Sequence, residues 1–426
     1  MSILAITSEL PWPLDTGGRL RTFHLLTGLA RSFDVRLVAG AAEAHPAGAC
    51  ALEHRGIRVL PVPLPPRSAW REGGRVLSAA QRREPYVLYR RHDRPEMRAA
   101  IRRAVADRAP DVVYFDHLDS ALFAPEVGTA RSVVDLHNVY SLIARRASQE
   151  HRRWALRTYL RREAELLAGV ERRLAPRADL LFSVSEQERR YFRDLGAAQV
   201  ALVPNGVDCE AFAGFPAGRP DAAPIILYVG AMSWAPNASA ATALAEHVLP
   251  SVRARIPGAR LRIVGKHPPA SLRARHGREG VEVLGGVPDV KPHLREAALL
   301  AVPLKTGGGT RLKILEAFAA GLPVVSTTVG AEGILCEAGR HLLVAEGDAF
   351  ADAVVRLLRD RAAGRQMATE ARDVVRRLYD WPVVVASAAR AIHDAFDSAP
   401  VRRSSPGVER PIAPAAAARA LGTTFL

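Results

Sequence analysis

Residues 302–321 read VPLKTGGGTRLKILEAFAAG, in which an apolar run, three glycines and a helix-forming segment follow one another. The apolar run predicts a buried strand that ends at Leu304. The segment after the glycines predicts a helix over residues 311–320, with Thr310 as its cap and Gly321 just past its end. A strand, a glycine-rich turn and a helix in this order are typical of parallel α/β sheets.

The glycine-rich turn also predicts an anion-binding site. Glycines at 307–309 let backbone N–H groups approach an anion without obstruction by side chains. The helix start adds unpaired N–H groups and about half a positive charge. Arg311 and Lys313 lie in the first turn, where a cation opposes the helix dipole unless a bound anion compensates it. The residues alone leave a second interpretation open, in which Thr310 caps an ordinary helix and Lys313 pairs with Glu316 on its surface.

Short apolar runs alternate with helical patterns along both halves of the 426-residue chain. In the first half these runs lie at residues 3–7, 35–40, 111–116, 132–137 and 180–185. In the second half they lie at residues 225–231, 261–265, 281–286, 299–304 and 323–328. Continuous apolar strands separated by helices predict parallel sheets covered on both faces. Two such series predict an α/β protein with two doubly wound, Rossmann-like domains facing a cleft.

The predicted boundary between the domains is a stretch rich in glycine, proline and alanine near residues 204–223. We therefore assign residues 1–208 to an N-terminal domain and residues 209–382 to a C-terminal domain. Residues 383–398 predict one more helix, which we expect to pack back on the N-terminal domain. Residues 399–426 are of low complexity and predict a disordered tail.

The composition indicates a globular protein of a reducing compartment. Apolar residues make up 48% of the chain and charged residues 24%, which allows two full hydrophobic cores. No apolar run reaches the length of about 18 residues that a membrane-spanning helix needs. The first residues carry no signal-peptide pattern, and three widely spaced cysteines argue against a disulfide framework or a thiolate zinc site. We therefore expect a cytoplasmic location.

The net charge is +15, and two segments of the N-terminal half hold much of it. Residues 67–103 contain 11 arginines against 4 acidic residues, and residues 145–177 contain 10 arginines against 4. Such segments attract phospholipid headgroups, phosphorylated carriers or nucleic acid. The second segment predicts a basic amphipathic helix or helix pair, which either lies on the inner face of an anionic membrane or packs into the core with its arginines in solvent. Its apolar residues are Trp154, Leu156, Tyr159, Leu160, Leu166, Leu167, Val170 and Leu174. We prefer packing into the core.

Several segments together resemble the family 4 retaining glycosyltransferases, which have the two-domain GT-B architecture. The resemblance is strongest in residues 302–321 and continues through GLPVVSTTVGAEGI (321–334). VGAMSWAPN (229–237), LRIVGK (261–266) and VEVLGGVPDV (281–290) also follow in the family's order. The resemblance implies a nucleoside-diphosphate sugar as donor substrate, no cofactor, and a glycan or lipid-linked acceptor.

The resemblance also implies the residues of the site. Glu316 is expected to bind the ribose of the nucleotide, and His137 to lie next to the transferred sugar. We expect His137, Arg311 and Lys313 to be the catalytic residues. The residues expected to bind the donor are Gly17, Gly18, Gly286, Val287, Gly307, Gly308, Gly309, Thr310, Glu316 and Gly330.

Two features of the N-terminal half leave alternatives open. Arg19 and Arg21 open the helix after the Gly17–Gly18 turn, where they indicate either a bound anion or solvated side chains. A histidine at a strand end, such as His137 or His117, can equally be a structural hydrogen-bonding group.

Two departures from the family concern the donor sugar and the diphosphate. The family has a glutamate eight positions before Glu316, where this chain has Gly308. It also has an arginine and a lysine after the first strand of the C-terminal domain, where VGAMSWAPN offers no cation. We expect Arg311 and Lys313, together with Lys305, to neutralise the diphosphate instead.

The predicted function is transfer of a sugar to an acceptor hydroxyl, with retention, in the synthesis of cell-envelope or extracellular polysaccharide. No paired DxD carboxylates, HExxH motif or GxSxG motif occurs, and we expect no metal. A nucleotide-sugar 2-epimerase is an alternative of the same architecture, which Gly308 disfavours because an epimerase needs acid/base carboxylates near the sugar. A non-catalytic protein that binds anions or nucleic acid is a third interpretation, but no nucleic-acid-binding motif supports it.

Overall fold

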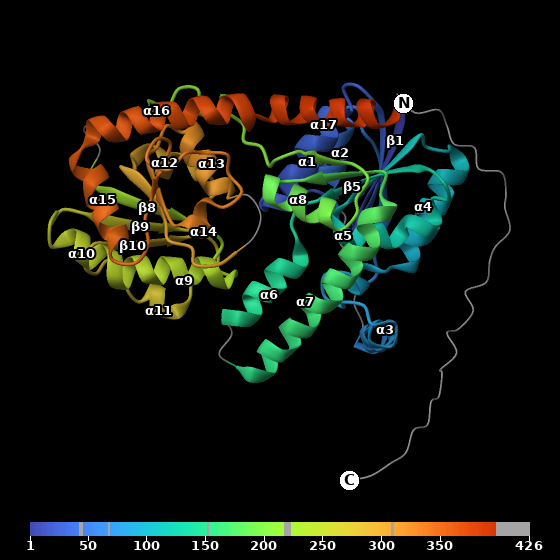
Figure 1. The fold of residues 1–426 in the computed structure, drawn as a ribbon, viewed down its shortest axis with the longest axis horizontal. Helices are drawn as coiled ribbons and strands as arrows, with labels where there is room; N and C mark the ends of the chain where they lie inside the picture. Colours follow the sequence, from blue (N-terminus) through green and yellow to red (C-terminus); the bar gives the residue numbers. More distant parts are fainter. Residues whose placement is uncertain (42–45, 67–68, 151–152, 217–222, 308–310, 398–426) are drawn as a thin grey trace, which may run out of the picture.

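The structure, a computed structural model, describes residues 1–41, 46–66, 69–150, 153–216, 223–307 and 311–397. It contains two domains that lie side by side, each built on one parallel β-sheet with helices around it (Figure 1). This confirms the predicted α/β fold with two Rossmann-like domains. Among the helices of the described residues, none combines the length and the apolar character that a membrane span requires.

The N-terminal sheet has seven parallel strands in the order β3-β2-β1-β4-β5-β6-β7. Their bounds are β1 (Ser2–Thr7), β2 (Asp34–Ala41), β3 (Arg58–Pro63), β4 (Val112–Asp116), β5 (Arg131–Leu136), β6 (Leu180–Ser183) and β7 (Val200–Leu202). The sequence patterns missed β3 and β7, which form the two edges of this sheet. Pro61 and Pro63 have no N–H to donate and are tolerated in β3 because it has only one neighbouring strand.

Side chains of this sheet alternate between two hydrophobic clusters. In β1, Ile3 and Ala5 face one cluster, whereas Leu4 and Ile6 face the other. The helices that contribute to the two faces are α1 (Gly17–Leu29), α2 (Pro46–Glu53) and α17 (Trp381–Phe396) on one side, and α4 (Pro95–Asp107), α5 (His117–Ser120), α6 (Tyr140–Glu150), α7 (Trp154–Leu174) and α8 (Glu186–Asp194) on the other. Burial on both faces explains why these strands read as unbroken apolar runs.

The C-terminal sheet has six parallel strands in the order β10-β9-β8-β11-β12-β13. Their bounds are β8 (Ile225–Val229), β9 (Arg260–Val264), β10 (Val281–Gly285), β11 (Leu299–Val302), β12 (Val324–Ser326) and β13 (Leu343–Val344). The helices are α9 (Ala235–Ala243), α10 (Leu249–Arg253), α11 (Ala270–Arg273), α12 (Lys291–Glu296), α13 (Leu312–Ala319), α14 (Thr328–Ala331), α15 (Ala349–Arg359) and α16 (Arg361–Leu378). One continuous cluster of buried side chains forms the core of this domain.

The chain passes between the domains twice, and the two passages touch. Val207 N–H donates to the carbonyl of Tyr379 at 2.8 Å, and Trp381 N–H donates to the carbonyl of Val207 at 3.2 Å. After this point α17 crosses over the N-terminal domain and packs against α1, as Figure 1 shows. The packing is close, because a Cβ on Gly28 would lie 2.4 Å from Val385.

Candidate active site

Each sheet has one point where the strand order reverses, and ligands of open parallel sheets bind at the carboxyl ends of the strands there. In the N-terminal sheet this point lies between β1 and β4, which end at Thr7 and Asp116. In the C-terminal sheet it lies between β8 and β11, which end at Val229 and Val302. The expected site residues that the structure describes lie in the loops or helices that follow β1, β5, β10, β11 and β12.

A pocket opens at the reversal point of the N-terminal sheet. It is lined by residues from the end of β1, the start of α1 and the start of α5, with further contributions from the segment before α4 and from α6. Its polar lining includes Thr7, Thr16, Arg19, His92, Asp116 and His117. The pocket therefore offers several hydrogen-bonding groups of the kind that orient a hydroxylated ligand.

Asp116 is the centre of a buried polar cluster at the end of β4. Its carboxylate lies 3.0 Å from His117 Nδ1 and 3.0 Å from His137 Nε2, and it accepts a hydrogen bond from Thr22 Oγ1 at 2.9 Å. Although burial opposes ionisation, the two imidazoles outweigh it and hold the pKa of Asp116 well below its usual range. Burial likewise opposes the charge of His117, but Asp116 outweighs this and raises the pKa of His117 to about 9.

The two histidines differ in depth, and the one expected beside the transferred sugar is the more buried. His137 is only 5% exposed and lies under His117, with 3.5 Å between the ring centroids. The His117 side chain is 30% exposed and lines the pocket. His117 also has a φ of +65°, a left-handed conformation that only the surrounding structure can enforce on a histidine. His117 therefore lines the pocket, and the buried His137 packs beneath it.

Arg21 does not face the cleft as an anion ligand. Its guanidinium is buried and pairs with Asp135, with 2.6 Å from Nη2 to Oδ1 and 2.9 Å from Nε to Oδ2. Its Nη1 also donates to the carbonyl of Pro204 at 2.9 Å, just after β7. Arg21 thus ties α1 to β5 and to the first passage between the domains. Arg19 pairs with Glu9 and Asp15 at 3.1 and 3.0 Å.

The two glycines at the start of α1 make the close approaches that the cleft requires. A Cβ on Gly18 would lie 3.2 Å from His117 Nε2, and a Cβ on Gly17 would lie 2.9 Å from Leu312 of the C-terminal domain. Thr16 caps the helix by accepting a hydrogen bond from Arg19 N–H. The start of α1 therefore faces the start of α13 across the cleft.

Lys313 brings a cation to the reversal point of the C-terminal sheet. Its Nζ donates to Asn237 Oδ1 at 2.8 Å and lies 4.4 Å from the centre of the Tyr228 ring. A Cβ on Gly230, directly after β8, would come within 2.8 Å of the same Nζ. Burial, with a smaller contribution from the charge of Arg311, lowers the pKa of Lys313 to about 7. The loop that follows β8 has no cation of its own, and Lys313 of α13 supplies one.

Arg311 is buried beside Gly307. Its Nη2 donates to the carbonyl of Val329 at 3.3 Å, and a Cβ on Gly307 would lie 2.9 Å from the same nitrogen and 2.8 Å from the Trp234 ring. Gly307 has a φ of +143°, which favours glycine. Burial lowers the pKa of Arg311 to about 10, so its positive charge persists near neutral pH.

The helix start differs from the prediction. The helix α13 begins at Leu312 with Arg311 at the cap position, where no side chain forms a capping hydrogen bond. The predicted cap residue, Thr310, is not among the residues that the structure describes, and neither are Gly308 and Gly309.

The remaining donor-site residues of α13 and β10 flank the same region. Glu316 follows Lys313 by one turn and is half-buried, and burial raises the pKa of its carboxyl to about 7. Gly286 follows β10 and lies close to Lys266, because a Cβ there would approach Lys266 Cγ at 2.9 Å. Val287 packs at the margin of the C-terminal core.

Gly330 packs closely against the C-terminal sheet, and its expected donor-binding role stays a prediction. Its N–H donates to Thr327 Oγ1 at 2.9 Å, so the amide is already engaged in capping α14. A Cβ on Gly330 would lie 2.3 Å from Ser326 Oγ and 2.7 Å from the carbonyl of Val302. The glycine is needed because α14 packs directly on β11 and β12.

Two ion pairs connect the cleft walls. Arg146 of α6 binds Glu332 with 2.6 Å from Nη1 to Oε2 and 2.8 Å from Nη2 to Oε1, and it also donates to the carbonyl of Gly307. Lys266 pairs with Asp15 at 3.1 Å. An arginine of the N-terminal domain thus contacts the glycine-rich turn of the C-terminal domain directly.

Comparison with known proteins agrees with this arrangement. The model of the glycosyl transferase 4-like domain matches residues 16–206, and the model of the glycosyl transferases group 1 matches residues 223–360. The two matches together span most of both domains. The chain belongs to the group 1 glycosyltransferases.

Curated relatives of this group 1 glycosyltransferase include two kinds of mannosyltransferase. The phosphatidyl-myo-inositol mannosyltransferase of Mycobacterium leprae is 30% identical over 49% of the chain and 57% of its own length. The GDP-mannose-dependent alpha-(1-6)-phosphatidylinositol monomannoside mannosyltransferase of Mycobacterium tuberculosis is 29% identical over 52% of the chain and 63% of its own length. The matched stretch thus spans about 60% of each relative.

Solved structures show the same fold. The sucrose-phosphate synthase of Thermosynechococcus elongatus superimposes with a TM-score of 0.69 at 19% identity, covering 94% of this chain and 100% of the other. The Anabaena protein HepE in complex with UDP gives a TM-score of 0.64 at 15% identity, covering 92% and 100%. These similarities confirm the GT-B architecture of the group 1 glycosyltransferase.

Within the described part of this group 1 glycosyltransferase, one group of side chains has the spacing of metal ligands: Asp116, His117 and His137, whose ligand atoms all lie within 4.8 Å of one another. Both imidazoles already use a nitrogen for a 3.0 Å contact with Asp116. That arrangement is a hydrogen-bonded cluster, and the expectation of a metal-independent reaction stays a prediction.

Sequence reasoning missed several residues of the site. Tyr228 and Asn237 hold Lys313, Asp116 holds both histidines, and Arg146 crosses the cleft. Asp116 carried a usable signal, because it ends a buried strand at the edge where ligands bind. The other three act through contacts between segments far apart in sequence, and no local pattern marks them.

Proposed function

We propose that this chain transfers a sugar from a nucleoside diphosphate, bound by the C-terminal domain, to a hydroxyl of an acceptor bound by the N-terminal domain. The observation that carries the proposal is the meeting of two ligand-binding strand edges across one cleft. The start of α1 faces the start of α13 there, with Gly17 against Leu312. One edge presents cations and the other presents a hydrogen-bonding pocket, which suits a charged donor and a neutral, hydroxylated acceptor.

The cations at the C-terminal edge support a diphosphate as the charged group. Lys313 lies under Gly230, and Arg311 lies beside Gly307, so both cations line glycines where the backbone can approach a phosphate closely. When the bond between sugar and phosphate breaks, negative charge grows on the leaving diphosphate. Cations already held in place stabilise that charge without a further reorganisation of the site.

The printed names of similar proteins support a nucleotide-linked sugar. One relative is described as GDP-mannose-dependent, and the Anabaena protein HepE has been solved with UDP and with UDP-glucose. For this chain we propose the same class of donor, a nucleoside diphosphate sugar, with Glu316 binding the ribose and Gly286 and Val287 next to the base. A screen with UDP- and GDP-sugars identifies the base and the sugar.

We propose that His117, supported by Asp116 and His137, contacts the transferred sugar or the acceptor hydroxyl. The proposed reaction retains the configuration of the sugar. It needs no metal, because Arg311 and Lys313 neutralise the diphosphate. Closure of the two domains aligns the reactants and excludes the water that would hydrolyse the donor. The acceptor is a glycan or a lipid-linked sugar of the cell envelope or of extracellular polysaccharide.

The test is a donor screen by mass spectrometry with purified full-length protein. UDP- and GDP-sugars are incubated with and without acceptor extracts, each in the presence and absence of EDTA. We expect one donor to be consumed only when acceptor is present, at the same rate with EDTA. Loss of turnover with EDTA would remove the claim of metal independence, and an epimerised sugar in the absence of acceptor would show an epimerase instead.

A further inference from the structure

The most exposed hydrophobic side chains gather on one part of the N-terminal domain. Of the fourteen large hydrophobic side chains recorded as exposed among the described residues, eight lie on α3 (Ala69–Arg82), on the segment directly after it, or at the start of α7. They are Trp70, Val76, Leu77, Val87, Leu88, Trp154, Leu156 and Tyr159. Trp70 is 93% exposed and Trp154 is 76% exposed, which is far above what packing in a core allows.

The first half of α7 carries this exposure because it extends beyond the domain. Every residue from 154 to 159 is exposed, whereas Glu163, Leu167 and Val170 in the second half are buried. Our preferred interpretation of this basic helix, packing into the core, is therefore correct only for its second half. Figure 1 shows α6 and α7 projecting away from the N-terminal sheet, with α3 nearby.

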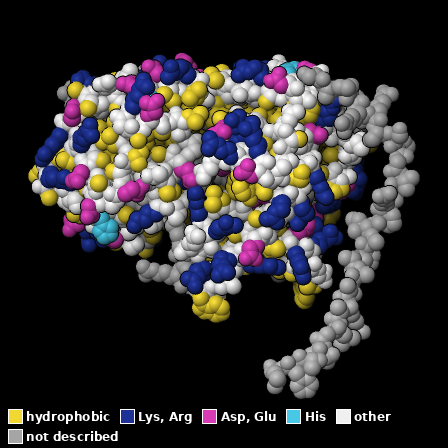
Figure 2. Space-filling model, in the orientation of Figure 1, with side chains coloured by type: hydrophobic (Ala, Val, Ile, Leu, Met, Phe, Trp, Pro, Cys, Tyr) yellow, Lys and Arg dark blue, Asp and Glu magenta, His cyan; other side chains and the backbone are white. Residues whose placement is uncertain are grey.

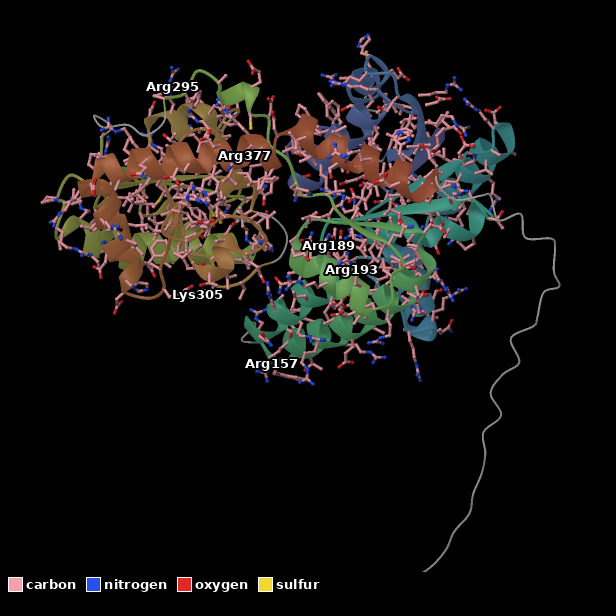
Figure 3. All side chains as sticks on the ribbon, turned by 45° about the horizontal axis from the view of Figure 1, so that its top comes forward. Arg157, Arg189, Arg193, Arg295, Lys305 and Arg377 are labelled. Carbon is pink, nitrogen blue, oxygen red and sulfur yellow. The ribbon has the colours of Figure 1, made fainter. Side chains whose placement is uncertain are left out.

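Arginines surround these hydrophobic side chains. Residues 153–162 contain four arginines and no acidic residue, and residues 69–83 contain four arginines against one glutamate. Arg157 and Arg161 are exposed, and Figure 3 places Arg157 near the outer end of α7. In the space-filling view, hydrophobic side chains protrude next to Lys and Arg side chains where α3 and α7 project (Figure 2).

The two projecting elements are joined and stand next to the pocket of the N-terminal domain. Glu163 of α7 accepts a hydrogen bond from Tyr86 N–H at 3.5 Å, just after α3, and it also contacts the Tyr159 hydroxyl. Leu88 and His92 continue from this junction into the lining of the pocket. The exposed surface and the pocket are therefore parts of one continuous face.

We propose that this surface, formed by α3, residues 85–89 and the first half of α7, docks on an anionic lipid bilayer. Tryptophan and tyrosine side chains prefer the headgroup level of a membrane, leucine and valine gain from the acyl region, and arginines bind lipid phosphates. The docked surface holds the adjoining pocket toward the membrane, where it meets an acceptor anchored by a lipid. This last step rests on the proposed function, whereas the docking does not.

A bilayer fits these observations better than another occupant does. A second copy of the chain would bring two arginine-rich surfaces together, and their like charges would repel. Nucleic acid would use the arginines but would leave Val76, Leu77 and Leu156 in water. A lipid surface uses both kinds of side chain at once.

Co-sedimentation of the full chain with vesicles tests the proposal. Vesicles of phosphatidylcholine alone are compared with vesicles that also contain phosphatidylglycerol, at low and at high salt. The variants are Trp70→Ser with Trp154→Ser, and separately Arg157→Glu with Arg161→Glu. The matched controls are Leu335→Ser with Leu378→Ser and Arg273→Glu with Arg278→Glu, which change exposed residues of the C-terminal domain.

We expect the wild-type chain to bind the anionic vesicles and to be released by salt. Each N-terminal double variant should lose about tenfold or more in vesicle affinity, and the controls should not. Nucleotide binding in solution is measured on the same variants and should stay unchanged, which separates a failure of docking from a failure of the proposed function. The proposal is overturned if the wild type ignores anionic vesicles, if the controls lose as much binding, or if the tryptophan variants abolish a dimer instead.

Discussion

Lys313 and Glu316 stand one turn apart on α13, and burial moves their pKa values toward each other. It lowers the pKa of the lysine to about 7 and raises the pKa of the glutamic acid to about 7. In the empty site the charge of Lys313 is therefore only partly present near neutral pH. A bound diphosphate favours the protonated amine, so donor binding and protonation of Lys313 are linked.

This linkage predicts that the chain takes up protons when it binds a nucleoside diphosphate above about pH 7. Titration calorimetry at about pH 8 in buffers of different ionisation enthalpy measures the uptake. Lys313→Met should abolish it and weaken binding by about 2 kcal/mol, the usual scale of a charged hydrogen bond. Lys291→Met, which changes a partly exposed lysine of α12, is the control. Binding without proton uptake by the wild type would show that Lys313 does not meet the phosphates.

His117 gives a second prediction at this scale. Asp116 raises its pKa to about 9, so the stability that this pair contributes is fully present below about pH 6.5 and disappears as the pH rises through 9. His117→Asn suits the left-handed backbone and removes the imidazole. Denaturant unfolding should show the advantage of the wild type shrinking by about 1–3 kcal/mol between pH 6.5 and 9.5. A difference that does not change with pH would contradict the pairing with Asp116.

The same variant separates the acceptor side of the cleft from the donor side. Because His117 lines the N-terminal pocket and the nucleotide is expected on α13, His117→Asn should slow sugar transfer by about tenfold or more. Its affinity for the nucleotide alone should remain within about threefold of the wild type. A large loss of nucleotide affinity would instead place His117 on the diphosphate.

At the scale of elements, the short helix α14 shows how a strand, a cap and a glycine depend on one another. Thr327 directly follows β12, and its hydroxyl caps α14 by accepting a hydrogen bond from the N–H of Gly330. Because Gly330 has no side chain, the helix packs directly on β11. The packing of α14 therefore positions its own residue Val329, whose carbonyl accepts a hydrogen bond from Arg311. Packing here acts on the site through the cation rather than by contact with a ligand.

Gly330→Ala tests that packing role. The added methyl would meet Ser326 and the carbonyl of Val302, so thermal or denaturant unfolding should show a loss of about 1–3 kcal/mol. Gly214→Ala adds the same methyl where nothing lies within 4 Å and should change stability by less than about 0.5 kcal/mol. A Gly330→Ala variant of full stability that no longer binds nucleotide would show that Gly330 faces the donor after all.

Most of the secondary structure was predictable because both sheets are parallel and covered on two faces. Their central strands are continuous apolar runs between helices, which local patterns detect well. The patterns failed at two edge strands: β3, which contains Pro61 and Pro63, and β7, which is only three residues long. Edge strands need less apolar character and form fewer hydrogen bonds, so their sequence signal is weak.

The site was predictable only where one segment carries the chemistry. Gly307, Arg311 and Lys313 are close in sequence, and they lie together near the reversal point of the C-terminal sheet. The relative depth of His117 and His137 depends on how α5 packs over β5, and the burial of Arg21 depends on its pairing with Asp135. These outcomes follow from tertiary contacts that no local pattern contains.

At the scale of the whole molecule, two connecting segments of the chain join the domains. A few polar contacts also link the domains across the cleft. The passage joins Val207 to Tyr379 and Trp381, and Gly206 admits the Trp381 ring at 2.5 Å from the position of a Cβ. Across the cleft, Arg146 binds Glu332 and the carbonyl of Gly307. Polar bridges of this kind can break and re-form, which suits domains that open to exchange substrates.

Breaking the bridge should slow turnover more than it weakens nucleotide binding. Arg146→Met and Glu332→Gln should each lower kcat by about threefold to tenfold, while the double variant should be no slower than the worse single one. Arg255 and Asp352 form an exposed ion pair at 2.6 Å within the C-terminal domain. Arg255→Met and Asp352→Asn, which remove this pair in the same way, are the control variants. Fully additive losses for Arg146 and Glu332 would show that they act independently.

We propose that the paired phosphates of a sugar nucleotide bind at the reversal point of the C-terminal sheet. The decisive measurement is a crystal structure of the chain with UDP or GDP. We expect diphosphate oxygens within hydrogen-bond distance of Lys313 Nζ and the Arg311 guanidinium, next to Gly230 and Gly307. A nucleotide bound elsewhere, with no density beside Lys313 and Arg311, would show that the diphosphate site is wrong.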